Sequence, residues 1–429
     1  MKPGNQQQML QGANSNKVKA LKDERDGYIS LSVFSGREIF YFPVQRRKAI
    51  CMMWRWIMTV RQDKKTDSQT GTVILEEVTL ESGRVLRQVE TAYERAGRKN
   101  GTPVVVCHAL TGNHHTVGTE ERPGWWRGLI HEGGYVDLNE HEVFTFNVIG
   151  GCSGSAGPLT RNPDSGAQYR SDFPFISVRD MVHVQKAALE KLGITSIHAV
   201  LGGSLGGMQA LEWVTLYPER VGQAVILAAT SSLSDYGMAY NAIARKAITD
   251  DPKWNGGHYA ANDPPVNGLA LARMTGMITY RSGSLFNQRF HRETKHGPGQ
   301  SHDEVAYQVE SYLLYQGDKF TKRFDANSYL YLLKAMDSHD LERESEETLQ
   351  ERLAPVQLPV TFISFTGDLL YPPEEMKRLA ETFAKAGAKA AFFEVDTVFG
   401  HDGFLTEYSK WGDIVRSALE KPAEEGKAI

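Results

Sequence analysis

The stretch AVLGGSLGGMQALEW, residues 199–213, places one serine, Ser204, among four glycines. Glycine weakens both strands and helices, so such a cluster between two apolar runs needs a structural reason. Residues 202–206 match the pattern G-x-S-x-G, after a strand-like run and before a helical one. In that context the serine lies at a sharp, strained turn, and the glycines let strand and helix approach closely. We therefore predict that Ser204 is a nucleophile beside a helix N-terminus, which favours negative charge there.

A tight turn or a phosphate-binding loop would also explain clustered glycines. The stretch lacks the Gly-Lys-Ser/Thr ending of a P-loop and the acidic partner of a dinucleotide-binding fingerprint. A serine hydroxyl is a poor nucleophile near pH 7 unless a general base, held by an acid, activates it. The presence of suitable partners elsewhere in the chain therefore decides between these interpretations.

Two residues far downstream can complete such a system. Asp368 follows the strand-like run PVTFISF, and His401 lies in the loop after the next such run, KAAFFEV. The order serine, acid, histidine is that of α/β-hydrolases, and loops at the carboxyl ends of parallel strands meet at one edge of a sheet. We therefore predict a catalytic triad of Ser204, Asp368 and His401. Backbone N–H groups of Leu110 and Leu205 are predicted to form the oxyanion hole.

The composition restricts the class of protein. The chain has 429 residues, a net charge of −4, 41% hydrophobic and 23% charged residues, which fits a soluble globular protein. No basic stripe indicates nucleic-acid binding, and no apolar run approaches the roughly 18 residues of a membrane span. Cys51, Cys107 and Cys152 fit neither a disulfide framework nor a zinc site. We expect a cytoplasmic protein with no metal.

Short apolar strands alternate with helices through most of the chain, which predicts an α/β fold: a mostly parallel sheet with helices on both faces. Residues 233–350 break this alternation and are helical in pattern, so we predict an inserted cap over the strand ends. The predicted core then consists of residues 58–232 and 351–429.

Residues 1–57 differ from the rest. They are first polar, then basic, and end in a short apolar stretch that contains Trp54 and Trp56. One interpretation is a disordered extension. A second is that translation starts at Met58 and the preceding residues are mis-annotated. A third, from the tryptophans beside basic residues, is a membrane-surface anchor.

Eight segments, in order, carry a resemblance to a known family. They are CHALTGNHH, GWWRGLI, FNVIGGCSGSAGP, DFPFISVRDMV, LGGSLGGMQALEW, RFDANSYLYLLKAMDSHD, DLLYPPEEM and GHDGFL. Together, from about residue 72 to about residue 411, the chain resembles homoserine O-acetyltransferases, enzymes of methionine biosynthesis with the α/β-hydrolase fold. One departure is Leu205, where the family often has methionine; only the backbone N–H is needed at this position.

The resemblance implies a two-step reaction and its substrates. Ser204 would take the acetyl group from acetyl-CoA, a co-substrate rather than a bound cofactor, and pass it to the hydroxyl of L-homoserine. Arg273 would bind the substrate carboxylate and Asp402 the substrate amine, with Arg245 as a weaker second candidate. Family members are expected to be homodimers joined through the cap. A carboxylesterase, a serine acceptor and a succinyl-CoA donor remain alternatives.

Overall fold

The structure is a computed structural model, and it describes residues 19–21, 28–35, 38–45, 68–343 and 346–420. The chain divides into two compact units, residues 1–65 and 66–429. The larger unit carries every predicted site residue.

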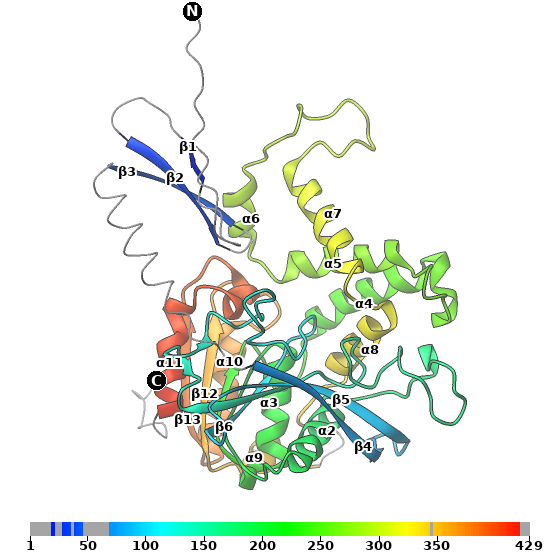
Figure 1. Cartoon of the computed structure of the whole chain (residues 1–429), viewed down its shortest axis with the longest axis vertical. Coiled ribbons are helices and arrows are strands. Elements are labelled where there is room, and N and C mark those ends of the chain that lie inside the picture. Colours follow the sequence, from blue (N-terminus) through cyan, green and yellow to red (C-terminus); the bar gives the residue numbers. More distant parts are fainter. Residues whose placement is uncertain (1–18, 22–27, 36–37, 46–67, 344–345, 421–429) are drawn as a thin grey trace, which may run out of the picture. The chain divides into compact units, whose positions relative to one another are not determined.

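The larger unit is built on an eight-stranded sheet with the order β13-β12-β11-β10-β6-β9-β5-β4. The strands from β13 to β9 pair in parallel, and β5 and β4 add two antiparallel strands at one edge. This confirms the predicted mostly parallel sheet (Figure 1). From β6 the chain proceeds first to β9 on one side and then to β10 on the other. Such a reversal opens a crevice at the carboxyl ends of β6 and β10.

The strands of this sheet are β4 Ser68–Thr79, β5 Val85–Gly97, β6 Thr102–Cys107, β9 His141–Phe146, β10 Ile197–Gly203, β11 Val221–Leu227, β12 Pro359–Phe365 and β13 Lys389–Val395. A separate pair is β7 Ile130–His131 with β8 Val136–Asp137. The helices are α2 Val178–Lys191, α3 Leu205–Leu216, α4 Asp235–Thr249, α5 Val266–Thr279, α6 Gly283–Phe290, α7 Gln308–Thr321, α8 Ala326–Asp337, α9 Leu349–Leu353, α10 Pro373–Lys385 and α11 Tyr408–Glu420.

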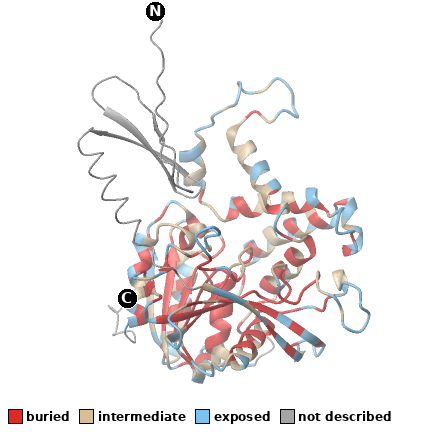
Figure 2. Cartoon of the chain, in the orientation of Figure 1, coloured by how far each residue is buried: buried red, intermediate tan, exposed pale blue. Residues whose placement is uncertain are grey.

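The central strands are buried on both faces (Figure 2). Along β6, Val105 and Cys107 join an apolar cluster with residues of α2, α3 and α10. Val104 and Val106 join a second cluster that contains Trp126 and Trp411. Alternate residues of a strand face opposite sides of a sheet, so the continuous apolar run of β6 fills both layers at once.

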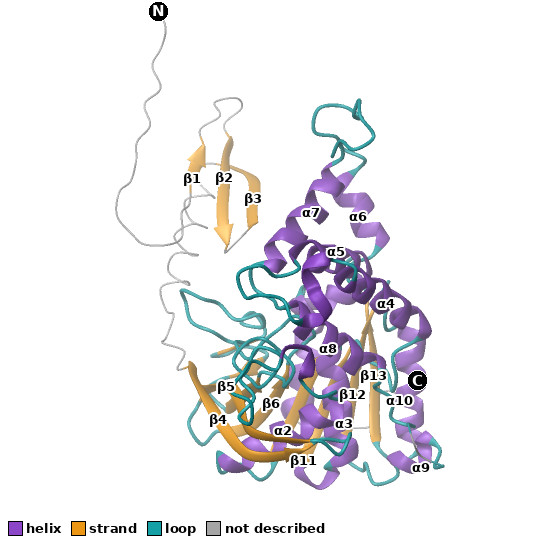
Figure 3. Cartoon of the chain, turned by 90° about the vertical axis from the view of Figure 1, so that its right-hand side faces the viewer, coloured by secondary structure: helices purple, strands orange, loops and turns teal. Residues whose placement is uncertain are grey.

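Helices α4 to α8 belong to the residues predicted as a cap, and they lie toward the carboxyl ends of the strands (Figure 3). The two ends of this insertion meet, because Ser232 and Asp340 form an isolated β-bridge and the Leu341 N–H donates to the Ser231 carbonyl at 2.9 Å. The chain therefore leaves the core after β11 and returns to nearly the same place before β12. This geometry holds the insertion over the carboxyl ends of the strands.

The smaller unit contains a three-stranded antiparallel sheet, β1 Lys19–Leu21, β2 Tyr28–Ser35 and β3 Glu38–Gln45. These strands were not predicted, although apolar residues alternate along the sequence of β2 in the way that favours a strand. The other residues of 1–57, including Trp54 and Trp56, lie outside the described residues. The three interpretations of this segment stay predictions.

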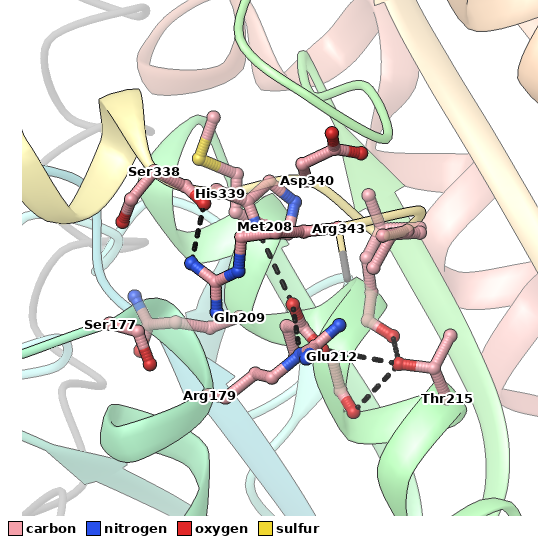
Figure 4. A network of polar contacts seen from close by, with 12 residues as sticks. Ser177, Arg179, Met208, Gln209, Glu212, Thr215, Ser338, His339, Asp340 and Arg343 are labelled. Atoms are coloured by element: carbon pink, nitrogen blue, oxygen red, sulfur yellow. Dashed lines mark hydrogen bonds and ion pairs between the residues drawn. The ribbon is translucent and has the colours of Figure 1, made fainter. Parts of the chain in front are cut away.

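A buried ionic network joins three parts of the larger unit (Figure 4). The Glu212 carboxylate on α3 accepts hydrogen bonds from Arg179 Nε at 3.2 and 3.3 Å and from Thr215 Oγ1 at 3.4 Å. His339 Nδ1 lies 3.3 Å from Glu212 Oε1 but outside hydrogen-bonding geometry. Arg179 also pairs with Glu81 at 3.2 Å. The network connects α3 to α2 and to the segment that returns from the cap.

Replacing Glu212 with glutamine should destabilise the protein by about 2 kcal/mol, because Arg179 loses the more buried of its two carboxylate partners and keeps only Glu81. The matched control is Glu219→Gln, whose side chain is 66% exposed and should change stability by less than about 0.5 kcal/mol. Urea unfolding followed by tryptophan fluorescence measures both. Equal effects of the two substitutions would contradict a stabilising role for this network.

Candidate active site

Ser204 lies at the turn between β10 and α3 with φ 60° and ψ −127°, a backbone conformation that residues other than glycine rarely adopt. The glycines explain how the turn is possible. A Cβ at Gly202 would lie 2.3 Å from the Gly206 carbonyl oxygen, and one at Gly206 would lie 2.2 Å from the Cys107 carbonyl oxygen. Close approach of strand and helix, rather than glycine flexibility alone, therefore requires these residues. The Ser204 side chain makes no capping hydrogen bond to α3, so its hydroxyl is not committed to the helix.

The two predicted partners of Ser204 are hydrogen-bonded to each other. His401 Nδ1 lies 2.8 Å from Asp368 Oδ2, and both side chains are buried. The other carboxylate oxygen, Oδ1, accepts the backbone N–H groups of Leu370 at 2.8 Å and Tyr371 at 3.0 Å. Because Asp368 can only accept, the Nδ1–H tautomer of His401 follows, which leaves Nε2 able to take a proton.

Burial disfavours the charged form of His401, but the attraction of the Asp368 carboxylate and its hydrogen bond outweigh this effect. The pKa of His401 is therefore raised above its ordinary value. An aspartate that stabilises the imidazolium in this way lowers the barrier for a proton transfer to the histidine.

A cavity of about 290 Å³ lies between the sheet and the cap. Ser204, Leu110, Arg273, His401 and Asp402 all line it. The structure thus brings these five predicted site residues together, although their roles stay predictions. Leu205, the first residue of α3, is fully buried directly after Ser204. Residues of α4 and α5 form the side of the cavity opposite the strand ends.

Arg273 on α5 has an unpaired hydrogen-bond donor in this cavity. Its guanidinium carbon lies 5.0 Å from the ring centre of Phe320 and 5.4 Å from that of Tyr280. Nη1 is buried and has no hydrogen-bond partner in the described part of the chain. Burying a charged donor without a partner is costly, so this geometry favours a site for an anionic ligand.

Asp402, predicted to bind the substrate amine, already has a cationic partner that was not predicted. Arg281 Nε lies 3.1 Å from Asp402 Oδ2, and both residues line the cavity. Burial raises the pKa of Asp402, while Arg281, His401 and Arg273 oppose that rise. The position of Arg281, just after the helix that carries Arg273, indicates that it lies near the site. Nothing in the sequence indicates that Arg281 pairs with Asp402.

Arg245, the second arginine considered at the sequence level, is not a lining residue of this cavity. It pairs with Asp337 on α8, and the Asn241 amide donates to the same carboxylate at 2.8 Å. This pairing ties α4 to α8, so Arg245 is occupied within the cap.

Three tyrosines around the site were not predicted, of which Tyr329 and Tyr371 are buried and Tyr280 is half-buried. Tyr280 and Tyr329 line the cavity, and the ring centre of Tyr371 lies 5.3 Å from that of His401. Burial raises the pKa of all three hydroxyls, which keeps them neutral. Tyr280 could have been found from its spacing, because it lies seven residues after Arg273, two turns along the same helix face.

Within the described ranges, no three His, Cys, Asp or Glu side chains come together to hold a metal ion. Among the helices that the structure describes, none has the length and apolar character needed to cross a membrane.

The fold and the arrangement of serine, histidine and aspartate at the strand ends define the α/β-hydrolase class, and the model of the α/β-hydrolase fold family matches residues 102–408. Homoserine O-acetyltransferase of Methanococcus vannielii is 43% identical over 353 residues, which cover 80% of this chain and 71% of that protein. The chain belongs to the homoserine O-acetyltransferase family.

Solved structures agree with this assignment. The crystal structure of homoserine O-acetyltransferase from Bacillus anthracis matches with a TM-score of 0.79 and 26% identity, covering 83% of this chain and 99% of that one. The crystal structure of esterase E22 matches with a TM-score of 0.76 and 25% identity, covering 82% and 100%. The same architecture is thus found in a transferase and in an esterase.

Proposed function

We propose that this chain transfers the acetyl group of acetyl-CoA to the hydroxyl of L-homoserine, giving O-acetyl-L-homoserine for methionine biosynthesis. The observation that carries the proposal beyond family membership is the buried, unpaired Nη1 of Arg273 in the cavity of Ser204. An amino-acid acceptor brings a carboxylate, which a guanidinium binds through two parallel hydrogen bonds. Asp402 supplies a carboxylate for the ammonium group of the same acceptor.

In the first step, Ser204 Oγ attacks the thioester carbonyl carbon of acetyl-CoA while His401 Nε2 takes the hydroxyl proton. The carbon–sulfur bond breaks, and the thiolate of CoA receives that proton from His401. The backbone N–H groups of Leu110 and Leu205 stabilise the oxyanion of the tetrahedral intermediate. The product is an acetyl ester of Ser204 and free CoA.

In the second step, the homoserine hydroxyl gives its proton to His401 and attacks the acetyl carbon. The ester bond to Ser204 breaks, and the proton returns from His401 to Ser204 Oγ. Water competes with homoserine at this stage, so a cavity covered by the cap favours transfer over hydrolysis. Acetyl-CoA acts as a co-substrate, and the mechanism requires no resident cofactor.

The experiment that tests the proposal combines two donors with two acceptors. Purified protein is supplied with acetyl-CoA or succinyl-CoA, and with L-homoserine or L-serine, while free CoA and the acylated amino acid are measured. We expect the highest kcat/KM for acetyl-CoA with L-homoserine. A higher kcat/KM with succinyl-CoA or with L-serine would contradict the proposed donor or acceptor and would identify that compound as the preferred substrate.

A carboxylesterase is the second candidate, favoured by the similarity to esterase E22. Water would then replace homoserine as the acceptor. An ester of a plain alcohol needs neither Arg273 nor Asp402, which argues against this activity. The two candidates are separated by CoA release with and without homoserine, because equal rates would identify hydrolysis.

Replacing Arg273 with alanine should raise the KM for homoserine by about 100-fold, since a charge-assisted pair of hydrogen bonds to the substrate carboxylate is lost. Formation of the acetyl-enzyme from acetyl-CoA should change little. Arg289→Ala, at an exposed cap arginine outside the cavity, is the matched control and should leave both quantities unchanged. Equal loss in both half-reactions would contradict a carboxylate-binding role.

The rate of acetyl-enzyme formation should fall as the pH decreases through the pKa of His401, because only the neutral imidazole can accept the Ser204 proton. The raised pKa of His401 places the midpoint above the ordinary value of 6.5. Stopped-flow measurement of the first half-reaction gives this profile without homoserine, so the acceptor's own amine does not contribute. A midpoint clearly below 6.5 would contradict the electrostatic role of Asp368.

The proposal includes a homodimer formed through the cap and a cytoplasmic location. Helices α4, α5 and α7 expose large apolar side chains that are between 46% and 58% accessible. These are Ile243, Leu271, Ile278, Leu314 and Tyr315. Exposed apolar groups of this kind favour association. In the part of the chain that the structure describes, Cys107 and Cys152 are free thiols, which suits a reducing compartment. Light scattering should give a dimer mass that Leu271→Glu reduces to a monomer; a monomeric parent protein would exclude this interface.

A further inference from the structure

A buried carboxamide joins the two segments that supply the oxyanion hole. Gln209 lies on the second turn of α3 and is fully buried. Its Nε2 donates to the His108 carbonyl at 3.1 Å and to the Leu205 carbonyl at 3.0 Å. His108 directly precedes the Ala109–Leu110 peptide, and Leu205 directly follows Ser204. A single side chain therefore holds both donor segments.

This contact lies where backbone pairing has ended. The parallel ladder between β6 and β10 stops at the pair Cys107 and Gly202. Beyond it β6 leads into the loop that carries Leu110, while β10 leads through Ser204 into α3, which begins with Leu205. The Gln209 amide supplies a hydrogen-bonded link between that loop and the start of α3, just past the last ladder pair.

The orientation of the Gln209 amide is determined by its partners. Nε2 faces two carbonyl oxygens, which can only accept, while Oε1 accepts Gln185 Nε2 at 2.7 Å. Gln185 is itself fixed, because its Oε1 accepts the Trp213 indole N–H, which can only donate, at 2.9 Å. Rotating either amide by 180° would place like groups against each other.

The other side of the Leu110 donor is held by His108. His108 Nδ1 lies 2.8 Å from the Ala109 carbonyl oxygen, and His108 Nε2 accepts the Val148 N–H at 3.0 Å. The Gly112 N–H donates to the same Ala109 carbonyl at 2.8 Å. That carbonyl and the Leu110 N–H belong to one planar peptide, so fixing the first fixes the direction of the second.

We propose that Gln209 is a positioning residue that sets the separation of the two oxyanion-hole donors, Leu110 N–H and Leu205 N–H. The donors stabilise the transition state only when both reach the oxyanion at hydrogen-bonding distance. Loss of the Gln209 amide frees the His108 segment to move relative to α3, while Ser204, Asp368 and His401 keep their own contacts. The inference rests on acyl transfer at Ser204 but not on the identity of the acyl donor or acceptor.

The test measures acetylation of Ser204 by p-nitrophenyl acetate, which needs the oxyanion hole but neither CoA nor homoserine. Gln209→Met keeps the shape and removes both donors, and it should lower the rate per active site roughly 10- to 100-fold. Gln209→Glu, which turns acceptors toward the two carbonyls, should lower it at least as much. The matched control is Gln223→Met, a buried glutamine on β11 that bonds the Leu419 carbonyl; its rate should not change.

Two further readouts separate positioning from general damage to the structure. Active sites are counted from the p-nitrophenol burst, so partial unfolding lowers the count rather than the rate per site. The pH midpoint should stay that of the parent enzyme, because His401 and Asp368 are untouched. If Gln209→Met is too unstable to purify, Gln185→Leu provides the test. It removes the hydrogen bond that orients the Gln209 amide and should give a smaller decrease in the rate per active site.

The inference is overturned if the rate per site of Gln209→Met equals that of Gln223→Met, or if the pH midpoint moves. It is supported when the rate falls, the midpoint stays, and both half-reactions with acetyl-CoA and homoserine fall by similar factors, since the same oxyanion hole serves each. If the parent protein reacts with p-nitrophenyl acetate but fails to use acetyl-CoA, the proposed transferase function fails while this test still gives a result.

Discussion

Ser204→Ala should abolish acetyl transfer, with a loss on the order of a millionfold in kcat, because residues of a triad act as a unit. The alanine variant should also fail to form an acetyl adduct, which intact-mass spectrometry detects after mixing with acetyl-CoA alone. The substitution removes only the hydroxyl, and that hydroxyl makes no capping bond to α3. The strained backbone at residue 204 depends on the neighbouring glycines, so the fold should be retained.

The control for this variant is Ser232→Ala, in the loop after β11, whose hydroxyl has no place in the proposed mechanism. It should retain full transfer activity and full adduct formation. A circular dichroism spectrum and an unfolding curve like those of the parent protein would show that Ser204→Ala is folded. An acetyl adduct that persists in Ser204→Ala would contradict the assignment of Ser204 as the nucleophile.

Much of the fold could be predicted because its signals are local. Gly202 and Gly206 reflect close backbone contacts, because a Cβ at Gly202 would lie 2.3 Å from the Gly206 carbonyl oxygen and one at Gly206 would lie 2.2 Å from the Cys107 carbonyl oxygen on the adjoining strand. The apolar run of β6 similarly reflects burial on both faces of a sheet. Patterns of this kind depend on secondary structure alone.

Asp368 and His401 could be located because their positions combine residue type, chain order and strand ends. Their 2.8 Å contact spans 33 residues of sequence, yet both loops leave neighbouring strands, β12 and β13. The sequence gives the order of Asp368 and His401 along the chain, and the pairing of β12 with β13 places the two residues in contact. Arg273 was identified by resemblance alone, and the structure adds that its buried Nη1 has no hydrogen-bond partner among the described residues.

The sequence did not reveal which polar side chains form hydrogen bonds with residues far away along the chain. Arg281 and Asp402 are 121 residues apart, and the Gln209 amide reaches a carbonyl 101 residues earlier in the chain. In each case several alternative partners of the same chemical type exist, and packing of the cap or of α3 against β6 selects one. A glutamine in an apolar helix has no pattern that distinguishes a structural from a positioning role.

Asp368→Asn should lower the rate of acetyl-enzyme formation by about four orders of magnitude while the geometry stays close to that of the parent. Asp368 Oδ1 accepts two backbone N–H groups, from Leu370 and Tyr371, so the asparagine must keep its oxygen at that position. Its NH₂ group then faces His401 Nδ1, which has to accept. The imidazole proton is forced onto Nε2, where it prevents uptake of the Ser204 proton.

Two measurements distinguish this tautomer effect from a loss of structure. The pH midpoint of the residual activity should move to lower pH, because the carboxylate that raised the pKa of His401 is gone. The control Asp396→Asn changes an exposed aspartate in the loop after β13 and should leave both rate and midpoint unchanged. A variant that loses activity but keeps the parent midpoint would mean that Asp368 holds the loop rather than polarising His401, and the proposed proton transfer would need another orienting group.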